Sequence, residues 1–245
     1  VVLVWNGEKI AGDLQDKGWR FKVPAQPAQK HCEYWFAFED QPQVKTESFQ
    51  IEIGVNRNLK SIESVQVEEN AVVFEGDGIW FSLKETPGGL DWEIKECQPQ
   101  KRRLLQGNEA FNLGVMRVEA CLDPFSFTIF EGDEVRVQSA KRNAVSLQVV
   151  GAEIVGAELT LELNDEKIYG LGERYNSLNQ RGEQIDQFVY NQYKGQGIRT
   201  YMPMPIAYTT GGFGFQIHTD RYSWIDCGKY DSQSLRLGTE ANSMQ

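Results

Sequence analysis

The chain has 245 residues, of which 40% are hydrophobic and 24% charged, and this length is sufficient to bury a core without disulfides or metal. Its 25 basic and 35 acidic residues give a net charge of -10, so nucleic acid is not an expected partner, because that binding depends on Lys and Arg neutralising phosphates. No segment approaches the ~20 apolar residues of a membrane span, so no membrane partner is expected either.

The N-terminal segment, VVLVWNGEKIAGD, has a short apolar run without a preceding basic region, which argues against a signal peptide. No Asn-x-Ser/Thr glycosylation site occurs in the sequence. The cysteines show no C-x-x-C spacing, so they are expected to be reduced thiols, with no metal or other cofactor. They are Cys32, Cys97, Cys121 and Cys227. Together these features predict a cytoplasmic protein.

Apolar and polar residues alternate with a period of two along much of the chain, which is typical of β-strands. The segments AVVFEGDGIWFSL (71–83) and PFSFTIFEGDEVRVQS (124–139) each place a polar, glycine-containing turn between two such runs, which predicts two hairpins. Further strands are predicted within 90–97, 158–163 and 212–220. No window has the apolar spacing of a helix. The final segment, 235–245, shows no pattern of a further strand or helix that would close the fold. The sequence therefore predicts an all-β fold, an antiparallel β-sandwich.

The segment YGLGERYNSLNQRG (169–182) contains three glycines, which neither a plain strand nor a plain helix favours. It lacks the patterns G-x-x-x-x-G-K-[ST] and G-x-G-x-x-G of phosphate and dinucleotide sites. A structural role fits better, because Gly170 and Gly172 permit a bulge or a close approach of another backbone. The charges of Glu173 and Arg174 would then hold a turn, and we expect backbone groups to satisfy them.

This segment resembles the signature of glycoside hydrolase family 31, near the end of its N-terminal β-sandwich domain. The matching residues are Tyr169, Gly170, Leu171, Gly172, Glu173, Arg174, Tyr175, Leu178, Asn179, Arg181 and Gly182. The segment TYMPMPIAYTTGGFGFQIHTDRYSWIDCG (200–228) is similar to the tyrosine-proline segment and the glycine-rich strand of the family, and CLDPFSFTIFEGDEV (121–135) resembles one of its hairpins. The similarity covers roughly residues 110–228.

The resemblance implies a galactose-mutarotase-like sandwich of the supersandwich type over residues 1–245, as one domain of a larger enzyme. Members of the family are retaining α-glycosidases whose catalytic aspartates lie on a (β/α)8 barrel that follows the sandwich. Retention needs two carboxyl groups ~5–5.5 Å apart. The chain contains no barrel pattern, so it is expected to hold no catalytic residue and to be inactive alone. Neither Asp186 nor Asp220 is nominated for that role.

The resemblance also implies that a loop of this domain reaches the substrate pocket of the barrel. At the matching positions stand Tyr190, Asn191, Gln192 and Tyr193, which we predict to contact a carbohydrate substrate. Family members commonly carry a carboxylate there, whereas Gln192 and Tyr193 supply an amide and a phenol. Such groups exchange hydrogen bonds with sugar hydroxyls but provide no charge.

Two other classes of function are compatible with the sequence. The first is a free-standing carbohydrate-binding module, which needs an exposed aromatic platform. The second is an enzyme similar to aldose epimerases, in which a histidine transfers a proton at the anomeric carbon. His218, after the strand predicted within 212–220, is the candidate for that histidine.

Overall fold

The computed structural model describes residues 1–15, 18–24, 31–98, 104–191 and 194–245. In these ranges the regular elements are β-strands in antiparallel sheets, which confirms the predicted all-β class, and no helix there is long and apolar enough to cross a membrane. The residues form two compact units, one of Val1–Val55 with Val149–Glu153 and one of Asn56–Gln148 with Ile154–Gln245. The expectation of a single domain over the whole chain stays a prediction.

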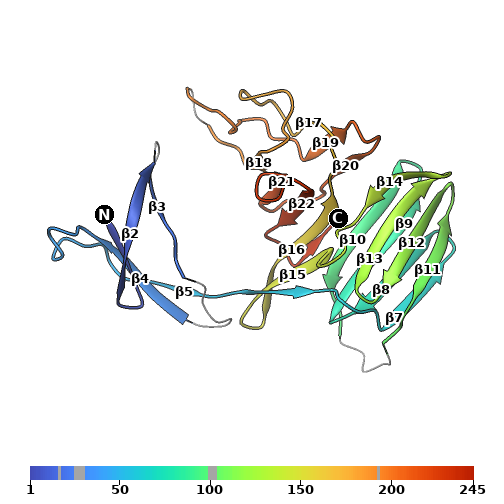
Figure 1. The fold of residues 1–245 in the computed structure, drawn as a ribbon, viewed down its shortest axis with the longest axis horizontal. Coiled ribbons are helices and arrows are strands. Elements are labelled where there is room, and N and C mark those ends of the chain that lie inside the picture. Colours follow the sequence, from blue (N-terminus) through green and yellow to red (C-terminus); the bar gives the residue numbers. More distant parts are fainter. Residues whose placement is uncertain (16–17, 25–30, 99–103, 192–193) are drawn as a thin grey trace. The chain divides into compact units, whose positions relative to one another are not determined.

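The first unit contains one five-stranded sheet, drawn in shades of blue in Figure 1. Its strands are β1 (Val2–Trp5), β2 (Glu8–Gln15), β3 (Gly18–Phe21), β4 (His31–Ala37) and β5 (Phe49–Glu52), in the spatial order β3-β2-β1-β4-β5. Aromatic side chains line up across neighbouring strands of this sheet. Tyr34 stacks on Trp5, with ring centroids 5.8 Å apart, and on Phe49, with centroids 5.3 Å apart.

The second unit contains a five-stranded and a four-stranded sheet made of hairpins. The first sheet comprises β7 (Ser64–Glu68), β8 (Ala71–Gly76), β9 (Ile79–Thr86), β10 (Gly89–Glu96) and β23 (Ser243–Met244), and the second comprises β11 (Asn108–Leu113), β12 (Met116–Leu122), β13 (Phe125–Glu131) and β14 (Glu134–Gln138). The two predicted hairpins are confirmed as β8–β9 and β13–β14. Asp77 and Gly78 connect β8 to β9 with positive φ (52° and 75°), as a two-residue turn that matches strand twist requires.

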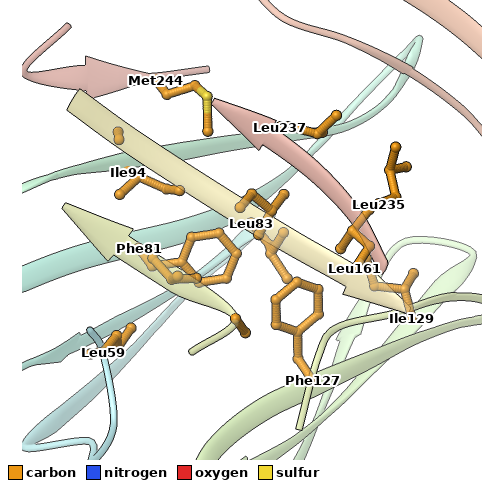
Figure 2. Close-up of a cluster of buried hydrophobic side chains, with 14 of the residues drawn as sticks. Leu59, Phe81, Leu83, Ile94, Phe127, Ile129, Leu161, Leu235, Leu237 and Met244 are labelled. Carbon is orange, nitrogen blue, oxygen red and sulfur yellow. The ribbon is translucent and has the colours of Figure 1, made fainter. Parts of the chain in front are cut away.

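These two sheets pack against each other through phenylalanines, which confirms the predicted sandwich (Figure 1). The ring centroids of Phe74 and Phe125 are 5.1 Å apart, and those of Phe81 and Phe127 are 5.3 Å apart. All four side chains are buried because strand alternation directs them toward the facing sheet. Figure 2 shows part of the core that continues from here to Leu161 and to β22.

A six-stranded sheet extends this core. It comprises β6 (Val55–Asn58), β15 (Val145–Val150), β16 (Glu153–Glu162), β18 (Gln184–Asp186), β21 (Ser223–Cys227) and β22 (Ser234–Thr239), in the order β18-β21-β22-β16-β15-β6. Consecutive residues of β16 are buried from Gly156 to Leu161, so side chains on both faces of the strand are shielded from water. The polar side chains among them therefore need hydrogen-bonding partners. The buried Glu158 carboxylate accepts two hydrogen bonds from the Arg236 guanidinium, at 3.0 and 2.8 Å.

A three-stranded sheet carries the glycine-rich segments. Its strands are β17 (Ile168–Gly170), β19 (Ile206–Thr209) and β20 (Gly214–Gln216), in the order β17-β19-β20. The alternation predicted within 212–220 is present, but the strand itself covers only the three residues of β20. This small sheet holds one end of the signature segment, and β18 follows its other end.

The end of the chain differs from the expectation that no element closes it. Strand β23 pairs with β10, and Met244 lies opposite Ile94. The Met244 side chain is buried, and the carbonyl of Gln245 accepts a hydrogen bond from the His218 backbone at 2.7 Å. This strand could not be predicted because two residues are too few to show alternation.

Candidate functional site

Three consecutive residues near the start of the signature segment lie in the left-handed region. Gly170, Leu171 and Gly172 have φ values of 112°, 66° and 93°. Backbone from another part of the chain lies directly against the glycines: a Cβ on Gly170 would be 2.6 Å from the Ile206 carbonyl oxygen, and one on Gly172 would collide with the carbonyl oxygen of Met202. The glycines therefore serve a close backbone approach, as predicted.

Arg174 holds three segments of main chain together. Its guanidinium donates hydrogen bonds to the carbonyls of Leu171 (2.7 Å), Ile198 (2.7 Å) and Asp186 (3.2 Å). Burial lowers the pKa of Arg174 to about 10, although the nearby Asp186 carboxylate acts in the opposite direction, so the group is a cation at neutral pH. The expectation of backbone partners is confirmed for Arg174. Glu173, in contrast, is exposed.

The second half of the signature is also bonded to the main chain. The Asn179 side-chain oxygen accepts hydrogen bonds from the backbone N–H groups of Ile168 (3.0 Å) and Arg181 (3.2 Å). The Arg181 guanidinium donates to the carbonyls of Glu166 (3.1 Å) and Ser232. These polar groups are engaged in holding turns, which supports the structural interpretation of the signature.

The Arg174 contacts define the ends of a loop. Asp186 and Ile198, whose carbonyls Arg174 binds, flank residues 187–197, here called the clamped loop. This loop includes the predicted sugar-contacting residues. Tyr190 and Asn191 are adjacent in it, with Tyr190 half-buried and Asn191 exposed. Gln192 and Tyr193 lie outside the described residues.

Tyr190 is held by four contacts. Its backbone N–H donates to the Thr200 carbonyl at 2.8 Å, and its hydroxyl donates to Oδ2 of Asp186 at 2.8 Å. The Arg199 guanidinium lies over its ring, 4.9 Å from the centroid. The Phe188 ring meets it edge-on, at 5.3 Å between centroids and an interplanar angle of 67°.

Asp186 is the centre of this group, and sequence reasoning did not identify it. Its second carboxylate oxygen, Oδ1, accepts a hydrogen bond of 2.8 Å from the Tyr222 hydroxyl. Burial, and then the hydrogen bond to Asp186, raises the pKa of both Tyr190 and Tyr222, so both phenols are donors at neutral pH. The available signal was a carboxylate four residues before a loop tyrosine. Tyr222 is 36 residues away, and nothing local indicates it. Asp220, by contrast, is 94% exposed.

Large apolar side chains are exposed in the clamped loop, in the signature segment and in residues 201–208. They are Tyr175, Leu178, Phe188, Val189, Tyr201, Met202, Met204 and Tyr208. The Tyr175 and Tyr201 hydroxyls are hydrogen-bonded to each other at 2.9 Å. Aromatic faces, phenols and amides of this kind suit the apolar faces and hydroxyls of sugars.

The other candidate chemistry receives little support. His218 is exposed at the end of its strand, and its backbone N–H bonds to Gln245. Within the described ranges, no group of three or more His, Cys, Asp and Glu side chains is arranged to hold a metal ion. The cysteines are free thiols, and Cys32 and Cys227 are buried.

Comparisons with known proteins agree with this geometry. A family model described as the glycosyl hydrolase 31 N-terminal galactose mutarotase-like domain matches residues 12–226. The chain is 39% identical over 115 residues to a 1,3-alpha-isomaltosidase of Kribbella flavida, a match covering 44% of this chain and 16% of that protein. It is 26% identical over 136 residues to an isomaltosyltransferase of Sporosarcina globispora, covering 53% of this chain and 12% of that protein.

A solved structure shares the fold of the chain. The cycloalternan-forming enzyme of Listeria monocytogenes, in complex with a pentasaccharide substrate, superposes with a TM-score of 0.69 at 16% identity. The superposition covers 98% of this chain and 26% of that one. The matched regions therefore cover about a quarter or less of each of these proteins.

Proposed function

Because the chain belongs to the family of glycosyl hydrolase 31 N-terminal galactose mutarotase-like domains, we propose that it is the non-catalytic part of a retaining α-glycosidase that hydrolyses terminal α-linked sugars. The matched relatives are several times longer than the region they share with it, which supports a catalytic barrel outside this chain as its partner. On this proposal the 245-residue chain alone hydrolyses no glycoside.

The proposed substrate is a neutral, α-linked gluco-oligosaccharide. The names of the matched relatives specify isomaltosyl units, which are uncharged. Within the clamped loop, Tyr190 and Asn191 carry a phenol and an amide, and Gln192 adds a second amide. Such groups donate and accept hydrogen bonds to hydroxyls without introducing a charge. An α-glucoside fits this chemistry better than a sugar with an acidic group.

The proposed role of the domain is to present the clamped loop to the substrate pocket, with Tyr190, Asn191, Gln192 and Tyr193 as the contacting residues. The observation that supports this role most directly is the binding of both loop ends by the single Arg174 guanidinium. A loop fixed at its base presents its side chains at low entropic cost on substrate binding. The half-buried guanidinium of Arg174 thus fixes both ends of this loop.

Loop variants in the full-length enzyme test this proposal. Tyr190→Ala, Asn191→Ala and Gln192→Ala should each lower kcat/KM by about tenfold or more, the value of one lost substrate contact, and Asn191→Ala and Gln192→Ala should change Tm little. Tyr230→Ala is a matched control, because Tyr230 is an exposed, hydrogen-bonded tyrosine outside the loop. If the loop variants retain the kcat/KM of the control, the loop does not contact substrate.

A free-standing carbohydrate-binding module is the second candidate, and the exposed aromatic residues near the loop favour it. Titration calorimetry with the 245-residue chain and isomaltose separates the two functions. Measurable affinity without a barrel supports the module, whereas affinity only in the full-length enzyme supports the shared pocket.

A further inference from the structure

Asp186 connects the framework of the domain to the loop tyrosine. It is the last residue of β18, where it pairs with Trp224 of β21, and its carbonyl is one of the three bound by Arg174. Its backbone is therefore fixed from two sides. The same residue directs its carboxylate to Tyr190, four residues further along the chain.

The carboxylate itself is also fixed. One oxygen accepts the Tyr222 hydroxyl and the other accepts the Tyr190 hydroxyl, each at 2.8 Å. Tyr222 directly precedes β21, so this second tyrosine belongs to the framework and not to the loop. Hydrogen bonds to an ionised carboxylate are stronger than those between neutral groups, which makes this a firm attachment for one side chain.

The remaining contacts of Tyr190 restrict the plane of its ring. Arg199 lies over the ring and Phe188 meets its edge, while Asp186 holds the hydroxyl at the tip. A tyrosine side chain has two rotatable angles before its hydroxyl, and a tether at the tip together with contacts at the ring restricts both. The ring is thus oriented before any ligand arrives.

We propose that Asp186 is a positioning residue that orients the Tyr190 ring for the sugar, braced by Tyr222, without touching the substrate itself. This inference rests on the proposed function of the clamped loop. Loss of the tether leaves the ring in place but less restricted, so ordering it again opposes substrate binding. The effect therefore falls on KM more than on kcat.

A double-mutant cycle in the full-length enzyme tests the inference, with isomaltose as substrate. Tyr190→Phe and Asp186→Ala should each raise KM by about three- to tenfold, which corresponds to ordering one side chain, and should change kcat by less than about twofold. The double variant should be no worse than Asp186→Ala alone, because both single changes remove the same hydrogen bond. Tyr230→Phe removes a tyrosine hydroxyl outside the loop, which is hydrogen-bonded to Gln184 at 3.0 Å, and should leave KM unchanged.

The outcomes separate this inference from the proposed function. If Tyr190→Ala lowers kcat/KM while Tyr190→Phe and Asp186→Ala retain the wild-type KM, the ring is used but the tether is not, and the inference is overturned alone. Additive effects of Tyr190→Phe and Asp186→Ala overturn it as well, because Asp186 then acts independently of the tyrosine. A Tyr190→Ala variant with unchanged kcat/KM removes the proposed role of the loop. If Asp186→Ala does not fold, Asp186→Asn takes its place, because a neutral amide oxygen accepts weaker hydrogen bonds than a carboxylate and should raise KM in the same direction; a wild-type KM in that variant overturns the inference.

Discussion

Gly172 provides a direct test of why the signature contains glycine. In Gly172→Ala the new Cβ collides with the Met202 carbonyl oxygen and lies 2.9 Å from both Met204 N and Pro203 Cα. Backbone atoms cannot move aside as a flexible side chain can, so the two segments must separate. This separation also weakens the hydrogen bond of 3.2 Å from the Glu173 N–H to Met202.

The cost of this substitution has three parts. A non-glycine residue at φ +93° costs about 1–2 kcal/mol, a lost hydrogen bond about 1 kcal/mol, and the steric displacement about 1–3 kcal/mol. We therefore expect Gly172→Ala to lower the free energy of unfolding by about 3–6 kcal/mol. Gly182 is a matched control because its φ is +85° and an added Cβ meets nothing within 4 Å. Gly182→Ala should cost only the conformational part, about 1–2 kcal/mol.

Thermal and urea denaturation of the 245-residue chain measure both values. A difference of about 2–4 kcal/mol between the two variants corresponds to about 4–16 °C in Tm for a protein of this size. If the two alanine variants unfold at the same temperature, the close approach at Gly172 contributes nothing and the reasoning is refuted.

Three further predictions concern the second unit. Burial, reinforced by the Asp226 carboxylate, raises the pKa of the Cys227 thiol from 9.0 to about 12. This thiol should therefore resist alkylation by iodoacetamide at pH 8 until the protein unfolds, which peptide mass spectrometry measures. The buried, protonated thiol contributes to the free energy of unfolding fully below pH 9.0, and this contribution is lost as pH rises toward 12. In urea titrations, Cys227→Ala should therefore lose less stability than the wild type over this pH range. Glu158→Gln should lower the free energy of unfolding by about 1–3 kcal/mol because it weakens the paired bonds to Arg236, and an unchanged urea midpoint would contradict this. Met244→Ala should lower it by about 2–5 kcal/mol because the side chain is buried, whereas a surface-like loss below about 0.5 kcal/mol would mean that the closing strand is not packed.

The parts of the fold that follow from local patterns could be predicted from the sequence. The hairpin with Asp77 and Gly78 at its turn and the hairpin β13–β14 were both identifiable, because alternation and turn residues are adjacent in the chain. The closing strand was missed because it pairs residue 244 with residue 94 and has no pattern of its own.

The candidate site shows the same division between local and distant contacts. The sequence indicated that Arg174 needs backbone partners, but its carbonyl partners lie up to 24 residues away and depend on how the loop returns. Glu173 differs from the expectation of backbone partners because its side chain is exposed and interacts with the Tyr175 hydroxyl. Asp186 was not identified because its importance comes from Tyr222, which the fold brings to it from a position 36 residues further along the chain.

Arg174 binds main-chain carbonyl oxygens, and this affects how the loop sequence of the domain can change during evolution. Every amino acid carries a carbonyl, so side chains between the two anchored positions can be exchanged without removing a partner of the guanidinium. On the proposed function of the clamped loop, new substrate preferences can therefore arise by replacing residues within the loop, while the anchorage is inherited unchanged. An engineer seeking altered sugar selectivity would randomise the interior of the loop and leave Arg174 and the glycines as they are.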